Sequence, residues 1–193
     1  MNSMNNKAYP RIFVLISALS SLLVAGCASM SNQPFTAYVG QEKIHLKVGV
    51  NVTDELRKAE NAKWNIPIGK SIATNAPVLA RHLFDDVVDM SNGQLPANET
   101  VAAILTPRVA YNTRTVGATG GGESIVDIKV EWTLSDSKGS TIWVNTIDGR
   151  SSASKRTSPQ KVAQKALEDL LLKSEHSISS AQAIKQFAQK TSP

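Results

Sequence analysis

The feature that most limits how this chain can fold is an apolar run near its start, which ends at the only cysteine, Cys27. Residues 1–11 carry Lys7 and Arg11 and no acidic residue, and residues 12–24 are aliphatic, small or aromatic. A basic segment followed by a short apolar run is the layout of a secretory signal peptide. The run is too short for a membrane-spanning helix, which needs roughly 20 apolar residues. We therefore expect the folded part of the chain to begin beyond it.

The end of this run, Leu23-Val24-Ala25-Gly26-Cys27, resembles the lipobox of bacterial lipoproteins. The resemblance implies signal cleavage between Gly26 and Cys27, a diacylglyceryl group on the Cys27 thiol, and a further fatty acid such as palmitate on the new amino terminus. Acyl chains contribute about 0.8 kcal/mol per buried CH₂, so such an anchor is effectively permanent. The alternatives are an ordinary transmembrane anchor and a free buried cysteine behind a signal of another kind.

The residues after the cysteine predict a location and a division of the chain. Ala28 and Ser29 follow Cys27, where an aspartate would imply retention in the inner membrane, so the lipoprotein resemblance implies the periplasmic leaflet of the outer membrane. We expect a signal peptide at 1–26, a lipidated amino terminus and tether at 27–40, and an α+β periplasmic domain at 41–193.

Charge and cysteine content narrow the possible partners and cofactors. The formal charge of +5 falls to +3 once residues 1–26, which hold two basic residues and no acid, are removed. A lone cysteine excludes an internal disulfide and any multi-thiolate metal site. We expect no nucleic-acid partner, contact with the membrane through the acyl chains on Cys27, and a partner protein in the cell envelope.

Hydrophobic periodicity predicts the first elements of the domain. Residues 43–52 alternate apolar and polar side chains, as a strand with one buried face does. A helix is predicted over 75–90, with Pro77 in its first turn, where the missing N–H breaks no hydrogen bond. Its apolar stripe has helical spacing: Ala76, Leu79, Ala80, Leu83, Phe84, Val87 and Val88.

The remaining pattern predicts strands at 101–111, 124–134 and 140–147, the last two joined by a hairpin turn. Pro107 cannot donate to a strand ladder, so we expect its strand to be at an edge or bulged. Two helices follow. Ser158 and Pro159 would cap the first, while Ser179 and Gln182 would form a capping box for the second.

Together these elements predict one α+β domain of order β-α-β-β-β-α-α. Its mostly antiparallel four-stranded sheet would have helices packed on one face. Trp132 and Trp143 lie on the two strands of the hairpin, and we expect Trp143 to face the side opposite Trp132.

The polar residues form no recognisable catalytic or ligand-binding pattern, so we expect a non-enzymatic protein with no catalytic, cofactor-binding or metal-binding residues. His45, His82 and His176 lie on different elements, and His82 beside Asp85 and Asp86 is more typical of a polar helix surface than of a metal site. The glycine-rich residues 117–124 lack the lysine of a phosphate-binding loop and favour a hairpin loop. The basic residues 150–156 favour a solvated connection, although they could contact anionic headgroups or an acidic partner.

The stretch from Ile104 to Gly149, followed by a long and then a short helix, resembles the YajG-type small periplasmic lipoproteins. That wider group includes auxiliary lipoproteins of lipid transporters and activators of cell-wall synthesis. The resemblance implies a binding or assembly component of a cell-envelope complex. The alternative is an auxiliary protein that binds a lipid or another amphiphile in an envelope transport system.

Overall fold

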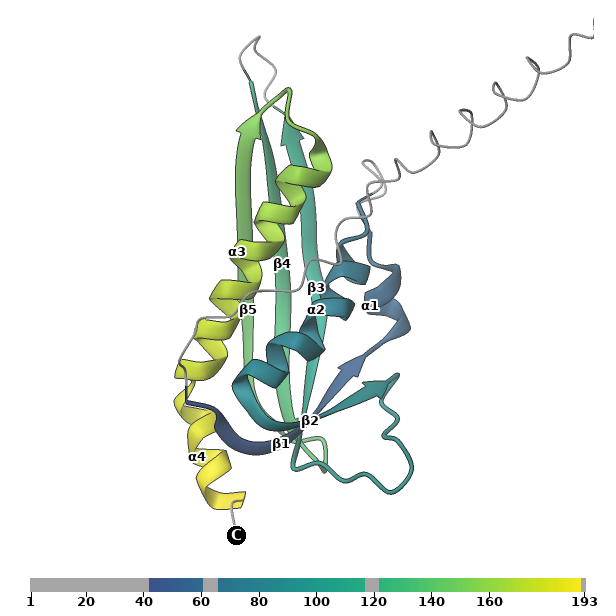
Figure 1. The fold of residues 1–193 in the computed structure, drawn as a ribbon, viewed down its shortest axis with the longest axis vertical. Helices are drawn as coiled ribbons and strands as arrows, with labels where there is room; N and C mark the ends of the chain where they lie inside the picture. Colours follow the sequence, from purple (N-terminus) through teal and green to yellow (C-terminus); the bar gives the residue numbers. More distant parts are fainter. Residues whose placement is uncertain (1–41, 61–65, 117–121, 192–193) are drawn as a thin grey trace, which may run out of the picture.

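The computed structural model describes residues 42–60, 66–116 and 122–191. In chain order the elements are β1 (Ile44–Val52), α1 (Asp54–Lys58), α2 (Ile68–Leu83), β2 (Phe84–Ser91), β3 (Ala103–Val116), β4 (Glu123–Asp136), β5 (Thr141–Ser154), α3 (Pro159–Ser180) and α4 (Gln182–Thr191). They form a single α+β domain in which helices lie against the sheet (Figure 1). Within the described residues, no helix is long and apolar enough to cross a bilayer.

The sheet has five strands in the order β2-β1-β3-β4-β5. β1 runs parallel to both β2 and β3, whereas β3, β4 and β5 are antiparallel neighbours. The prediction of a mostly antiparallel four-stranded sheet is therefore wrong in strand number and in its description of the β1 side. The added strand is β2, and the sheet is mixed.

The predicted helix over 75–90 is in fact the second half of α2 followed directly by β2. Phe84 already has extended dihedral angles, φ −122° and ψ 152°, and pairs with Ile44. Ala76, Leu79, Ala80 and Leu83 are buried as predicted. The residues after them contain no glycine or proline to mark the change, and Val87 and Val88 happen to continue the helical spacing.

The true start of α2 lies nine residues before Pro77, which is inside the helix rather than in its first turn. Gly69 is in the first turn and approaches the end of α1 closely: its N–H donates to the carbonyl of Ala59 at 2.7 Å. A Cβ atom on Gly69 would lie 1.8 Å from the carbonyl oxygen of Leu56. Only glycine therefore allows α1 and α2 to pack in this way.

β3, β4 and β5 each have 14 residues, longer than predicted. β1 pairs with β3 only from Ala103 to Leu105, so Pro107 lies beyond this pairing and interrupts no β1–β3 hydrogen bond. The register against β4 shifts between Val109 and Tyr111. The expectation for Pro107 is therefore met in part: β3 is an interior strand and the bulge lies beyond Pro107, but β3 has no β1 partner at this residue.

The two C-terminal helices are confirmed, but only one predicted cap is. The Ser158 hydroxyl accepts a hydrogen bond from the N–H of Lys161, and Pro159 occupies the first turn of α3. Ser179 does not cap α4. It lies within α3, where its hydroxyl donates to the carbonyl of His176, and α4 begins at Gln182.

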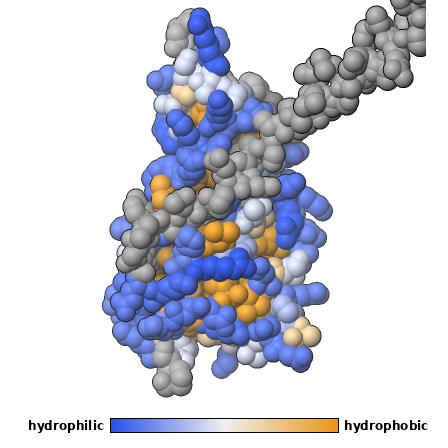
Figure 2. Space-filling model, in the orientation of Figure 1, coloured by the Kyte–Doolittle hydropathy of each residue, from blue (hydrophilic) through white to orange (hydrophobic). Residues whose placement is uncertain are grey.

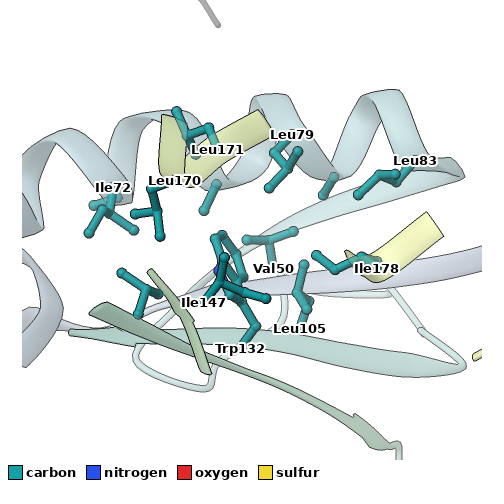
Figure 3. Packing of buried hydrophobic residues seen from close by; sticks show 14 of the residues in the cluster. Val50, Ile72, Leu79, Leu83, Leu105, Trp132, Ile147, Leu170, Leu171 and Ile178 are labelled. Carbon is teal, nitrogen blue, oxygen red and sulfur yellow. The ribbon is translucent and has the colours of Figure 1, made fainter. Parts of the chain in front are cut away.

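The core fills the space between the helices and one face of the sheet. In Figure 3 the side chains of α2 and α3, among them Leu79 and Leu170, point toward Trp132 and Val50 on the strands. Trp132, Leu170 and Val50 have no exposed surface. Trp143 pairs with Leu134 and packs partly buried against the same core, so the expectation that it faces away from Trp132 is wrong.

Candidate functional site

A surface pocket lies where the beginning of β1 meets the end of α3 and the side of α4. Its volume is about 520 Å³, and it is open to solvent. Figure 1 shows the start of β1 beside the junction of these two helices, at the end of the domain that also carries the C-terminus. Its lining residues are Glu42, Lys43, Ile44, His45, His176, Ser179, Ser180, Lys185, Ala188 and Gln189.

His45 in this pocket forms an ion pair with Asp85 of β2. Its Nδ1 lies 2.5 Å from a carboxylate oxygen of Asp85, and the imidazole is 74% exposed. The hydrogen bond and the charge of Asp85 raise the pKa of His45 above its ordinary value of 6.5, and the charge of Glu42 adds to the effect. The imidazolium form is therefore favoured at this position.

A neighbouring ion-pair group joins β1 to the edge of the sheet. Lys47 Nζ lies 3.1 Å from a carboxylate oxygen of Asp86 in β2. It also lies 2.8 Å from a carboxylate oxygen of Glu99, which belongs to the connection between β2 and β3. Hydrogen bonds to Glu99 and Asp86 raise the pKa of Lys47. Asp85 and Asp86 were predicted on a helix; they are strand residues, each paired with a cation of β1.

The histidines were predicted to lie on different elements with no shared site, yet His45 and His176 line one pocket together with serines. A serine nucleophile needs a hydrogen bond to its base. In the structure, Ser179 and Ser180 instead donate to the carbonyls of His176 and Ser177. Among the described residues, the hydroxyl groups of this pocket therefore bond to backbone carbonyls of α3 rather than to the imidazole of His45, which pairs with Asp85.

His82 lies in the last turn of α2, whereas Asp85 and Asp86 belong to β2, so the three residues do not share one helix surface as predicted. Across residues 42–60, 66–116 and 122–191, no three histidine, cysteine, aspartate or glutamate side chains come together as a metal site would require.

The second candidate surface is the outer face of β3, β4 and β5, the face turned away from the core. Val144, opposite Thr133, and Tyr111, opposite Lys129, lie on it and are 53% and 51% exposed. Two ion pairs lie on this face, Arg108 with Glu131 at 3.1 Å and Arg150 with Asp127 at 3.4 Å. The face therefore combines half-exposed apolar side chains with paired charges.

The free edge of β5 is partly closed by α3. The N–H of Arg150 donates to Asp169, and Lys173 donates to the carbonyl of Asp148. Asp169 and Lys173 also form an ion pair of 2.8 Å, which raises the pKa of Lys173. The expectation of a basic loop over 150–156 is wrong for its first five residues, since Arg150–Ser154 belong to β5.

On the side of the molecule that carries the helices, opposite the outer face of the sheet, Figure 2 shows an apolar area over the region of α2, surrounded by hydrophilic residues. Several predicted features lie outside the described residues: the signal peptide, Gly26 and Cys27, the tether, and residues 117–121 of the glycine-rich segment. No local sequence pattern indicates that His45 pairs with Asp85, because this contact depends on the β1–β2 pairing. Likewise, no local pattern indicates that His176 lies in the same pocket, because this depends on the packing of α4 on β1.

No protein-family model and no curated protein matches the chain. Among solved structures it is similar to a Xanthomonas campestris protein of the DUF330 family, with a TM-score of 0.49 and 10% identity over 82% of this chain and 96% of that one. It is similar to a minor lipoprotein from Acinetobacter baumannii, with a TM-score of 0.45 and 12% identity over 70% of this chain and 94% of that one.

It is also similar to the PelC dodecamer from Paraburkholderia phytofirmans, with a TM-score of 0.44 and 20% identity over 75% of this chain and 90% of that one. These values do not assign the chain to a family. The resemblance to the YajG-type proteins stays a prediction, and the proposals below rest on this chain's own residues.

Proposed function

We propose that this protein is an outer-membrane lipoprotein, anchored through Cys27, whose α+β domain binds another envelope protein and does no chemistry itself. The anchor is supported by the basic segment, the apolar run and the sequence Leu23 to Cys27. The binding role is supported by the arrangement of the described residues, in which the core occupies one side of the sheet and Tyr111 and Val144 are about half exposed on the other.

The observation that carries the binding role is the position of Tyr111 and Val144. Among the described residues these are the large hydrophobic side chains that remain exposed, and both lie on the outer face. Aromatic side chains are enriched at protein interfaces. Because Arg108 and Arg150 are neutralised by acidic neighbours, this face suits a protein surface better than a polyanion.

The alternative function, a carrier of lipid or another amphiphile, needs an apolar cavity between the helices and the sheet. In the described part of the chain that space is filled by Trp132, Leu105, Ile128 and Leu170, all fully buried. The pocket at the start of β1 is open to solvent, and charged residues such as Lys43, Lys185 and Glu42 stand in its lining. The packing therefore favours the binding role over the carrier role.

The test is site-specific photocrosslinking of the full chain in its native envelope. A photoreactive phenylalanine analogue replaces Tyr111 or Val144 on the outer face, and Lys165, an exposed residue of α3, serves as the matched control. We expect both outer-face positions to capture the same envelope protein, and the Lys165 position to capture none of it.

The captured protein is identified by peptide mass spectrometry, and the crosslink is repeated from the partner's side. The proposal is contradicted if neither outer-face position gives a crosslink, or if Lys165 captures the same protein equally well. Capture that persists unchanged when Cys27→Ser removes the anchor would contradict the link between anchoring and binding.

A further inference from the structure

The pocket at the start of β1 gathers positively charged and hydrogen-bond-donating side chains from three elements. Lys43 lies just before β1 and His45 lies in it, while His176 comes from α3 and Lys185 from α4. Gln189 and the hydroxyl groups of Ser179 and Ser180 add neutral donors. Lys43 and His45 precede the pocket residues of α3 and α4 by more than 130 positions in the sequence, so the fold brings the two groups together.

The acidic side chains near this group are fewer, and one is already engaged. Glu42 is the carboxylate that lines the pocket, and Asp85 is held by the imidazole of His45. Because Asp85 balances the charge of the His45 imidazolium, the surplus at the pocket wall is that of Lys43 and Lys185 over Glu42. Such a site favours an anion, because exposed ammonium groups and imidazolium act as donors to oxyanions.

The size of the pocket indicates more than an inorganic ion. Small-molecule sites are typically about 300–1,000 Å³, and 520 Å³ lies within that range. The wall also contains the apolar side chains of Ile44 and Ala188, which suit a carbon skeleton attached to the anion. A phosphate ester with a small polyol part combines these properties.

The short segment between the pocket and Cys27 limits how far the pocket can lie from an anchoring membrane. Residues 28–41 join Cys27 to Glu42, which lines the pocket. Fourteen residues span at most about 50 Å when fully extended. If Cys27 is acylated, as the proposed function states, this pocket lies within about 50 Å of the headgroups of the membrane that holds the anchor.

We propose that this pocket binds a phosphate ester, with Lys43, His45, His176 and Lys185 as its principal contacts. The same chemistry is offered by phospholipid headgroups and by soluble phosphate esters. The headgroup source rests on the proposed function, since it requires the anchor, whereas the soluble source does not. The test has one arm for each source.

In the first arm the full chain, held in non-ionic detergent, is titrated with glycerol 1-phosphate while the imidazole ring signals of His45 and His176 are followed by NMR. We expect both signals to shift together and to saturate. The double variant Lys43→Gln/Lys185→Gln should weaken the apparent affinity at least tenfold. Lys161→Gln/Lys165→Gln, which removes two exposed lysines of α3 outside the pocket, should change it less than twofold.

In the second arm the full chain is placed in nanodiscs of phosphatidylcholine, with or without phosphatidylglycerol. A shift of both histidine signals that depends on phosphatidylglycerol assigns the headgroup as the ligand. A shift produced only by added glycerol 1-phosphate assigns a soluble ester.

The proposal is overturned if neither probe moves His45 and His176 together, or if the two double variants weaken binding equally. An unmodified Cys27, detected by the mass of the same sample, would contradict the proposed function. The glycerol phosphate arm would still decide whether the pocket binds the ester.

Discussion

Successive residues of β3, β4 and β5 point alternately to the inner and the outer face of the sheet, and the two faces have opposite environments. Trp132 and Leu134 face inward and have no exposed surface, whereas Val144, which pairs with Thr133, is half exposed on the outer side. The inner face is covered by α2 and α3, and the outer face of these strands carries paired charges. The contrast shows which side chains hold the domain together and which remain exposed.

The largest expected effect is on the inner face. Trp132→Ala removes the largest fully buried side chain, and we expect a loss of about 3–5 kcal/mol in the free energy of unfolding. Its neighbour on the opposite face, Thr133→Ala, should change stability by less than about 0.5 kcal/mol. Urea unfolding of the full chain measures both. Equal losses would contradict the assignment of the two faces.

A second effect tests the contact between α3 and the sheet. A Cβ atom on Gly149 would lie 2.2 Å from the carbonyl oxygen of Ala166 and 2.5 Å from Cβ of Leu170. Gly149→Ala must therefore push α3 away from β5, and we expect a loss of about 1–3 kcal/mol. Thr146→Ala, at an exposed position of the same strand, is the matched control. A stability unchanged by Gly149→Ala would mean that α3 packs elsewhere.

A third effect separates the two serines predicted as helix caps. Ser158→Ala removes the acceptor for the Lys161 N–H and should lower the free energy of unfolding by about 1 kcal/mol. Ser179→Ala removes only a hydroxyl group bonded to a carbonyl within α3, and its effect should be smaller. Thermal unfolding of the two variants under the same conditions distinguishes them, and the reverse order would restore the predicted capping box.

A fourth effect is a pH dependence on the outer side of β1. Because Asp85, and more weakly Glu42, raise the pKa of His45, the ion pair stabilises the folded state fully below pH 6.5. Its contribution is lost as the pH rises through the folded-state pKa. We expect an NMR titration midpoint for His45 above 6.5, and a return toward 6.5 in Asp85→Asn. A midpoint unchanged by Asp85→Asn would disprove the pairing in solution.

The smallest expected effect on stability is also the most informative for function. Val144→Ser replaces an exposed side chain on the outer face, so stability should change by less than about 0.5 kcal/mol. If the outer face binds the partner, the crosslink from Tyr111 should weaken in this variant. Retention of the full crosslink would show that Val144 lies outside the interface.

The domain class and most elements could be predicted from the sequence because their patterns are local. The alternation in β4 and the Ser158–Pro159 start of α3 need only neighbouring residues to be recognised. The boundary at Leu83 could not be predicted, because the chain passes from α2 into β2 without a turn residue. Strand partners depend on residues far along the chain, so the parallel pairing of β1 and β2 left no local pattern.

The candidate pocket shows the same division. Each histidine could be identified, but their position in one pocket could not be predicted, because it depends on the packing of α4, which follows α3, against β1. Trp143 was placed on the wrong face for a related reason. The hairpin register that pairs it with Leu134 includes a shift next to that pair, between Leu134 and Ser135, which the alternation alone does not reveal.

The central claim is that this domain is held at a membrane through Cys27, and the mass of the protein extracted from the envelope tests it most directly. We predict a chain that lacks residues 1–26 and carries acyl groups at Cys27, and an unprocessed or mislocalised precursor for Cys27→Ser. An envelope protein that retains residues 1–26, or that begins elsewhere with an unmodified Cys27, would contradict the account.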